Sequence, residues 1–330
     1  MIISKTPFRV SLFGGGTDYP SWFKAHGGAV IGFAIDKYCY VSIRSLPPFF
    51  EHKSRIVYSR IEAVQSVAEI KHPAIRGILA DRNIHGGVEI HYDGDLPAWS
   101  GIGSSSSFTV GMINVASRML GQVLDPRNLA EEAIRLEQEV MGESVGSQDQ
   151  IWAAHGGMNR IDFHKTGDFE VLSLEISPER REALMGNLML FFTGRTRRSD
   201  IIARDIVTRI DEHGRALDAM RAMVDQAETI LTRPENDLDG LGHLLRESWA
   251  LKQTLSPLVS TPEIASLHDR GIEAGALGGK LLGAGGGGFF LFYVPVAARQ
   301  QVRSALSDFT EVAINVDLEG STIVLNTNYE

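Results

Sequence analysis

The chain has 330 residues, of which 43% are hydrophobic and 22% are charged, and its formal net charge is −9. This composition is typical of a globular protein with room for two modest domains. The negative charge argues against nucleic acid as a partner, because binding a phosphate backbone needs a basic face, but it allows a small phosphorylated ligand.

The cysteine content and the hydropathy pattern indicate the cellular compartment in which the protein is expected. Cys39 is the only cysteine, which excludes an internal disulfide and a cysteine zinc site and fits a reducing compartment. The first residues lack the charged and apolar regions of a signal peptide, and no apolar run approaches the ~20 residues of a membrane span. We therefore expect a cytoplasmic protein that binds neither membranes nor nucleic acid.

Strand signals dominate the first part of the chain. Phe8, Val10 and Leu12 alternate as in a half-buried strand, and the β-branched and aromatic stretch 29–44 predicts one or two more. Further strands are expected near 56–58, 88–92, 158–163 and 171–174, and helices near 72–82, 104–119 and 129–142.

The second part is predicted to be mainly helical. The apolar run 188–192 predicts a buried strand, and a long helical pattern follows from 202 to 227. Further helices are expected near 241–255, 262–273 and 297–309, and further strands near 289–294, 313–316 and 322–325. Because strands and helices are mixed without strict alternation, we predict an α+β fold with a domain boundary within 178–186.

A loop rich in glycine and serine, 95–108, connects the predicted strand 88–92 to the next helix. Gly101 and Gly103 allow close approach of the backbone, and the helix then opens on four serines, 104–107. A helix start offers unpaired N–H groups and a positive dipole end, and serine hydroxyls can also bind a hard cation. The loop favours phosphate and Mg²⁺ binding, and the alternative is an ordinary serine-capped helix.

Two more glycine segments lie at 13–20 and 278–288. The first fits either a turn that approaches a ligand or a simple tight turn. The second contains G-x-G-x-x-G, but its glycines precede a predicted strand instead of following one, so a dinucleotide site is not expected. Similarly, G-x-S-x-G at 142–146 follows a helix, which argues against Ser144 as a nucleophile.

Glu137 and Asp149 are a pair of carboxylates around a loop that contains glycine. Glu137 lies near the end of the predicted helix 129–142, and Asp149 lies between Gly146 and Gly156. Taken alone, the pattern favours a solvated helix face for Glu137 and a helix cap for Asp149.

Three motifs together resemble the galactokinase, homoserine kinase, mevalonate kinase and phosphomevalonate kinase (GHMP) superfamily. They are Thr6–Tyr19, Leu96–Ser107 and Gly279–Gly288, in family order. The run Gly-Gly-Gly-Thr-Asp-Tyr at 14–19, with 94–97 and 145–150, is similar to the bacterial heptose phosphate kinase branch. The resemblance implies a ribosomal-protein-like α/β domain over 1–185, with the nucleotide site and catalytic Asp, and a ferredoxin-like α+β domain over 186–330, with the third motif.

By position, the resemblance implies a site for ATP and Mg²⁺. Residues expected to hold the nucleotide are Pro97, Gly101, Gly103, Ser104, Ser105 and Ser106. Ser105, two places after the second glycine of Gly-x-Gly, and Glu137 are the implied Mg²⁺ ligands. A set of two protein ligands suits this ion, which usually keeps several waters.

The resemblance also implies catalytic and substrate residues. Asp149, followed by Gln as in galactokinases, is the implied general base, and Arg9 is the implied catalytic cation. Arg197 is favoured as a ligand for the sugar phosphate because the heptose kinase branch has an arginine there, although a solvated basic turn is equally compatible. Residues expected to contact the sugar phosphate are Gly15, Gly16, Thr17, Asp18, Arg197, Lys280, Gly285 and Gly286.

The expected function is that of a sugar kinase using ATP to phosphorylate the anomeric hydroxyl of D-glycero-D-manno-heptose 7-phosphate. The product, the 1,7-bisphosphate, would serve nucleotide-activated heptose and cell-surface polysaccharide synthesis. The alternatives are a kinase for another sugar, such as fucose, and a non-catalytic sensor of nucleotide and sugar. The presence of Ser105, Glu137, Asp149 and Arg9 argues against the sensor. The oligomeric state stays open, with a homodimer as one option.

Overall fold

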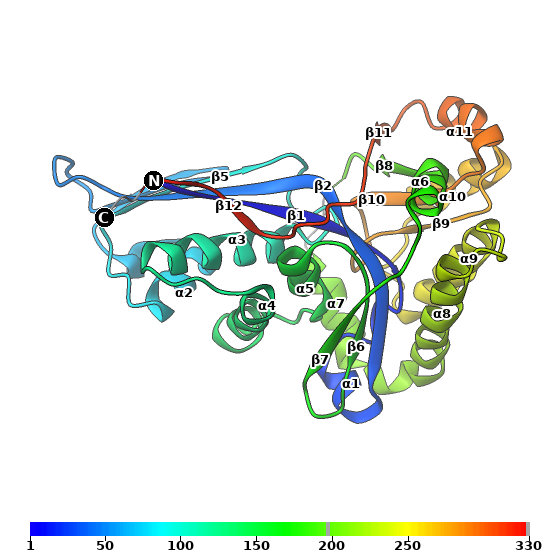
Figure 1. Cartoon of the computed structure of the whole chain (residues 1–330), viewed down its shortest axis with the longest axis horizontal. Helices are drawn as coiled ribbons and strands as arrows, with labels where there is room; N and C mark the ends of the chain where they lie inside the picture. Colours follow the sequence, from blue (N-terminus) through cyan, green and yellow to red (C-terminus); the bar gives the residue numbers. More distant parts are fainter. Residues whose placement is uncertain (196–198, 328–330) are drawn as a thin grey trace.

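The computed structural model describes residues 1–195 and 199–327 (Figure 1). In these ranges the strands form an eight-stranded sheet and a four-stranded sheet, each covered by helices, which confirms the predicted α+β fold. None of the described helices is long and apolar enough to cross a membrane.

The larger sheet is built around two long antiparallel strands, β1 and β2. Residues 28–45 form one strand where the sequence left one or two open. One edge of β2 pairs with β1, and its other edge pairs with β6 at the start of the strand and with β5 at the end. The last strand of the chain returns to pair with β1, so the fold divides less simply than a single cut near 185. The strands are β1 (Ile2–Phe13), β2 (Gly28–Ser45), β3 (Ser54–Val57), β4 (Ile61–Val64), β5 (Val88–Gly94), β6 (Met158–Phe163), β7 (Phe169–Ser173) and β12 (Thr322–Asn326).

Helices cover one face of this sheet, as Figure 1 shows. The central one, α3, packs on β1 and β2 and buries most of its residues. Gly111 allows this close approach, because a Cβ there would lie only 2.9 Å from the Thr6 hydroxyl oxygen. The other helices of this part are α1 (Pro20–His26), α2 (Pro73–Asp81), α4 (Pro126–Arg135) and α5 (Gln148–His155), beside α3 (Ser104–Met119).

The predicted helix 129–142 is divided in the structure. Its α-helical part ends at Arg135, and Leu136–Val140 forms a π-helical turn in which the Met141 N–H donates to the Leu136 carbonyl at 2.9 Å. Single π turns occur often at functional sites, because they rotate one side chain out of the helical pattern. Here the turn contains Glu137, whose side chain is fully buried.

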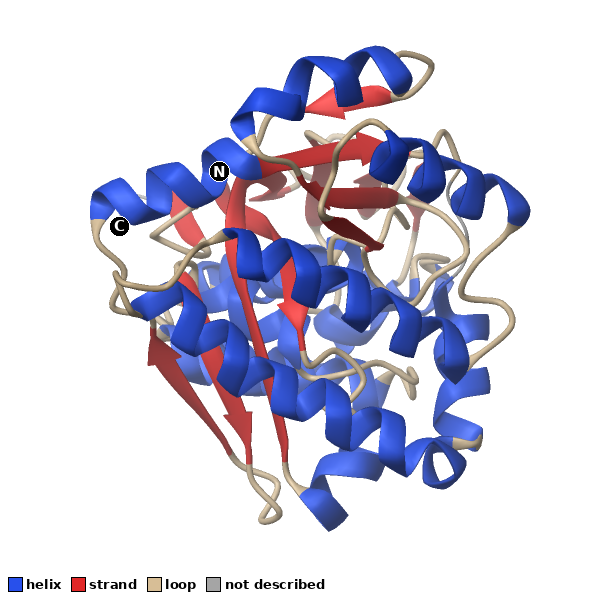
Figure 2. Cartoon of the chain, turned by 90° about the vertical axis from the view of Figure 1, so that its right-hand side faces the viewer, coloured by secondary structure: helices blue, strands red, loops and turns tan. Residues whose placement is uncertain are grey.

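The smaller sheet has the order β11-β8-β10-β9 and carries an aromatic core in which Phe290 and Phe292 lie 4.6 Å apart between ring centroids. Figure 2 shows helices lying in front of these strands. Its strands are β8 (Leu188–Phe192), β9 (Gly278–Leu281), β10 (Phe289–Tyr293) and β11 (Thr310–Val312). The helices of this part are α6 (Pro178–Asn187), α7 (Ser199–Thr208), α8 (Gly214–Thr232), α9 (Asp239–Leu255), α10 (Pro262–Glu273) and α11 (Arg299–Ala305).

Some predicted elements were wrong in extent or kind. The long pattern 202–227 is two helices separated by a 3₁₀ turn at Ile210–His213. The predicted strand 313–316 is only a bridge between Ile35 and Val316. Strand β9 was missed because glycine-rich sequence shows no apolar alternation, although Gly278 and Gly279 pair with Tyr293 and Phe292.

Candidate active site

The three glycine segments meet backbone against backbone. A Cβ at Gly283 of the third segment would lie 2.5 Å from the Cα of Gly101 in the second. Strand β1, which runs into the first segment, joins them, since the Arg9 N–H donates to the Ile102 carbonyl at 3.1 Å. Only glycine permits such close approach of the two chains. Segments that are far apart in the sequence therefore form one site between the two sheets.

The four serines at the start of α3 have separate roles. Gly103 takes a left-handed conformation, with φ of 74°, and ends the loop. The Ser104 hydroxyl accepts from the Trp99 N–H at 3.1 Å, and the Ser107 hydroxyl donates to the Pro7 carbonyl at 2.8 Å. Ser105 is exposed at the helix start, where free N–H groups and the dipole favour a phosphate.

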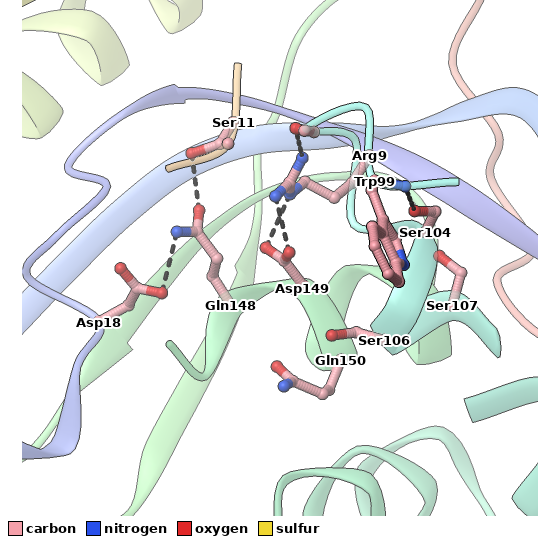
Figure 3. Close-up of polar contacts among 12 residues, drawn as sticks. Arg9, Ser11, Asp18, Trp99, Ser104, Ser106, Ser107, Gln148, Asp149 and Gln150 are labelled. Atoms are coloured by element: carbon pink, nitrogen blue, oxygen red, sulfur yellow. Dashed lines mark hydrogen bonds and ion pairs between the residues drawn. The ribbon is translucent and has the colours of Figure 1, made fainter. Parts of the chain in front are cut away.

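Arg9 and Asp149 form a bidentate ion pair, shown in Figure 3. Arg9 Nε and Nη2 donate to the two carboxylate oxygens at 2.7 and 2.6 Å, while Nη1 donates to the Gly101 carbonyl at 2.6 Å. A Cβ at Gly103 would lie 3.3 Å from the Asp149 carboxylate. The predicted base and the predicted cation thus lie together beside the start of α3.

A second carboxylate, Asp18, is fixed beside this pair. It accepts from the Gly16 N–H and from Gln148 Nε2, both at 2.9 Å, and the Ser11 hydroxyl donates to Gln148 Oε1 at 2.6 Å (Figure 3). Burial raises the pKa of Asp18, and the charge of Asp149 adds to this effect. Gln148 and Ser11 were not predicted; the only signal was that Gln148 precedes Asp149.

Glu137 is the third carboxylate of the site, and its side chain is fully buried. Its Oε2 accepts from the Ser106 hydroxyl at 2.9 Å and from Gln150 Nε2 at 2.5 Å. Its Oε1 is buried and accepts no hydrogen bond of normal distance and angle from the described residues, but the Thr109 hydroxyl is close enough to offset part of the rise in its pKa. Burial is the main cause that raises the pKa of Glu137 to about 7. An unpartnered carboxylate oxygen beside a hydroxyl fits a hard cation such as Mg²⁺.

The structure pairs Glu137 with Ser106, whereas the sequence resemblance implied Ser105. Successive helical side chains point about 100° apart, so only one of two neighbouring serines can face Glu137. Ser106 is 4% exposed and faces the carboxylate, while Ser105 is exposed. No three or more His, Cys, Asp or Glu among the described residues are grouped so that they could hold a metal ion. A metal bound at Glu137 and Ser106 would therefore have few protein ligands.

Several of the predicted substrate residues make contacts within the protein. Thr17 is fully buried, and its hydroxyl donates to the carbonyls of Gly14 and Ala29 at 2.8 and 2.9 Å, so it holds the turn. Gly285 and Gly286 pack against Val259, to whose carbonyl the Gly286 N–H donates at 2.9 Å.

Three further residues were predicted to bind the nucleotide or the sugar phosphate. Pro97 contributes its carbonyl, which accepts from the Ser100 hydroxyl at 2.5 Å. Gly15 lies beside the Asp18 network, since a Cβ there would be 3.7 Å from Gln148 Nε2. Arg197 lies outside the described residues.

Two lysines complete the site. Lys280, which was predicted, is 3% exposed, and its Nζ donates to the Leu12 carbonyl at 2.7 Å. Lys252 was not predicted, because an isolated lysine in a helix gives no signal; its Nζ donates to the carbonyls of Leu281 and Gly283. The site as a whole combines a helix start, buried cations and carboxylates, which suits transfer of a phosphoryl group to a hydroxyl.

Comparison with known proteins agrees with this chemistry. Residues 64–157 match the model of the GHMP kinases N-terminal domain, and residues 217–311 match that of the GHMP kinases C-terminal domain. The two matches contain the second and third glycine segments, Glu137 and Asp149.

Individual relatives cover nearly the whole chain. The D-glycero-alpha-D-manno-heptose 7-phosphate kinase of Campylobacter jejuni is 28% identical over 317 residues, which are 92% of this chain and 93% of the relative. The crystal structure of a D-glycero-D-manno-heptose 1-phosphate kinase from Bacteroides thetaiotaomicron superposes with a TM-score of 0.81 at 22% identity, covering 99% of this chain and 100% of that one. Lactococcus lactis galactokinase with galactose gives 0.72 at 18% identity, covering 97% and 94%.

Replacing Glu137 with Gln is expected to stabilise the ligand-free protein, more at pH 8 than at pH 5. Because the folded pKa of about 7 exceeds the ordinary 4.5, ionising Glu137 destabilises the fold fully above pH 7 and not at all below pH 4.5. The effect is on the order of 3 kcal/mol at most. Thermal unfolding at both pH values measures it, with exposed Glu139→Gln as the control. Equal effects at the two pH values would contradict this account.

Gly288→Ala is expected to lower the free energy of unfolding by roughly 2–4 kcal/mol, from backbone strain and steric overlap. Gly288 has φ of 109°, and its Cβ would lie 2.1 Å from the Ser100 carbonyl oxygen. Urea unfolding measures the change. Gly186→Ala is the control, since a Cβ there meets nothing within 4 Å. Equal stability of the two variants would contradict the prediction, because it would show that the backbones at Ser100 and Gly288 can move apart without a loss of stability.

Proposed function

This chain belongs to the GHMP kinase family, and we propose that it uses ATP and Mg²⁺ to phosphorylate the anomeric hydroxyl of D-glycero-D-manno-heptose 7-phosphate. Membership of the family makes it a phosphotransferase with a hydroxyl acceptor. The choice of acceptor is supported by similarity to the Campylobacter heptose 7-phosphate kinase along nearly the whole chain. The 1,7-bisphosphate product would then serve synthesis of nucleotide-activated heptose and cell-surface polysaccharide.

The observation that carries the proposal is the Arg9–Asp149 pair beside the start of α3. A hydroxyl nucleophile must lose its proton as it attacks the γ-phosphate, and Asp149 lies where that proton can be accepted. Arg9 orients the Asp149 carboxylate through two hydrogen bonds, and its guanidinium is the cation that would stabilise the developing charge. Each carboxylate oxygen has two lone pairs, so the bonds from Arg9 leave Asp149 able to accept one more hydrogen.

The nucleotide phosphates would lie along Gly101–Ser106, where free N–H groups of the helix start can bind them. Glu137 and Ser106 are the proposed metal residues, and Ser105 is left to contact phosphate. When bound, Mg²⁺ neutralises charge on the β- and γ-phosphates.

The acceptor sugar would lie on the side of Asp18. Its carboxylate is oriented by Gly16 and Gln148 and can accept a hydrogen bond from a sugar hydroxyl. The phosphate at the other end of the sugar is assigned to Arg197, as the resemblance implies.

An ADP-release assay over a panel of sugars tests the substrate. The panel pairs each sugar 7-phosphate with the same free sugar and includes fucose and galactose. We expect turnover of the heptose 7-phosphate, and a kcat/KM for the free heptose lower by at least about 100-fold, because the phosphate-binding cations would be unpaired. Turnover of a free sugar, with none of the heptose 7-phosphate, would overturn the proposal.

Asp149→Asn is expected to lower kcat by a factor of about 10²–10⁴, because it removes the general base. The Kd of Mg–ATP is expected to change little, since the nucleotide contacts are on α3. Steady-state kinetics and calorimetric titration measure the two quantities, and Asp225→Asn, with an exposed side chain, is the control. Near-normal kcat in Asp149→Asn would remove Asp149 from the mechanism.

A further inference from the structure

Lys252, in the last turn of α9, is a buried lysine that the proposed mechanism does not use. The residue is 8% exposed, and its Nζ donates to the carbonyl oxygens of Leu281, at 2.7 Å, and Gly283. Lys280 extends from β9 and donates to the Leu12 carbonyl at 2.7 Å, two residues before the first glycine turn. The two ammonium groups therefore lie at the junction of the first and third glycine segments.

These lysines have no carboxylate partner in the part of the chain that the structure describes; their hydrogen bonds go to backbone carbonyls. Asp149 is bound through both oxygens by Arg9. Burial, with the charges of Lys280 and Arg9, lowers the pKa of Lys252 well below its usual value. Burial and Arg9 also lower the pKa of Lys280 to about 7. The region thus gathers two lysines whose charged forms the protein does not balance, and a bound anion would favour those charged forms.

A cluster of this kind destabilises the ligand-free fold. Burying an ammonium group without a counter-ion is unfavourable, and apolar side chains of similar size would pack here with less penalty. An ammonium group has three N–H donors. The contacts above use two donors of Lys252 and one of Lys280, so about one and two remain. A tetrahedral anion with several oxygens would take up these donors and balance the charge.

We propose that Lys252 and Lys280 form a subsite for a phosphate group of a bound substrate, with Lys252 as a further phosphate-binding residue. The position supports this, because Gly283, which Lys252 holds, lies against Gly101 of the nucleotide loop. The inference rests on the kinase function proposed above, under which two phosphates reach this region. They are the γ-phosphate of ATP and the phosphate of the sugar acceptor.

The test uses the full chain with two substitutions that remove the charge in different ways. Lys252→Gln keeps N–H donors for the two carbonyls, and Lys252→Met keeps the length of the side chain. Lys165→Gln, at an exposed turn between β6 and β7, is the matched control. Calorimetric titration measures the Kd of a non-hydrolysable Mg–ATP analogue, and steady-state kinetics give the KM of whichever sugar phosphate the wild type uses.

We expect one of these two constants to rise about 10- to 100-fold in both Lys252 variants, the range for a lost hydrogen bond to a charged group. A rise confined to the nucleotide analogue identifies the γ-phosphate, and a rise confined to the sugar phosphate identifies the acceptor. Values within twofold of wild type for both substrates overturn the proposal. Failure of the wild type to use heptose 7-phosphate would count against the proposed function alone, since the nucleotide arm still tests the lysines.

A second measurement applies if neither variant folds, as judged by circular dichroism. The wild-type protein is acetylated with acetic anhydride, and modification of Lys252 and Lys165 is followed by mass spectrometry. We expect the Mg–ATP analogue or the sugar phosphate to slow acetylation of Lys252 at least fivefold while Lys165 is unaffected. An unchanged rate at Lys252 with every ligand would overturn the proposal.

Discussion

The Arg9–Asp149 ion pair is the interaction on which the site depends. Through one guanidinium group, Arg9 joins β1, the glycine loop before α3 and the first turn of α5. Arg9 is 4% exposed, so losing its partner would leave a buried charge, which typically destabilises a fold by about 3–5 kcal/mol. Glycines at 101, 103 and 283 are required by the same arrangement, because side chains there would separate the segments that the pair holds together.

The charge distribution explains how an acidic protein can bind phosphorylated ligands. The chain carries a net charge of −9, yet Arg9, Lys252 and Lys280 are buried. The half-buried Asp149 is the carboxylate bound to Arg9. A bound phosphate favours the charged forms of the two lysines, and inside a low-dielectric site that attraction is stronger than at a surface patch. The net charge of the whole chain therefore does not predict the electrostatic field inside the site.

Much of the fold could be predicted from the sequence, since alternation and helical spacing found most strands and helices. Two features were not predicted, for physical reasons. Strand β9 is rich in glycine and so shows no apolar alternation, and the π-helical turn at Glu137 depends on tertiary packing. The proposed roles of Arg9, Asp149 and Glu137 came from motif resemblance, because each residue taken alone is equally compatible with an ordinary structural role. Ser106 and Lys252 could not be chosen from the sequence, since their partners, Glu137 and the carbonyls of Leu281 and Gly283, are distant along the chain.

The first turn of α5 couples the three parts of the site. Gln148 donates to Asp18, Asp149 binds Arg9, and Gln150 donates to Glu137, so three consecutive residues reach the proposed acceptor, base and metal positions. Consecutive helical side chains diverge by about 100°, which is why one turn can serve three directions. Their relative positions are then fixed by helix geometry instead of by separate loops. A shift of about 1 Å in this turn would misplace all three groups at once, and such displacements are enough to slow catalysis strongly.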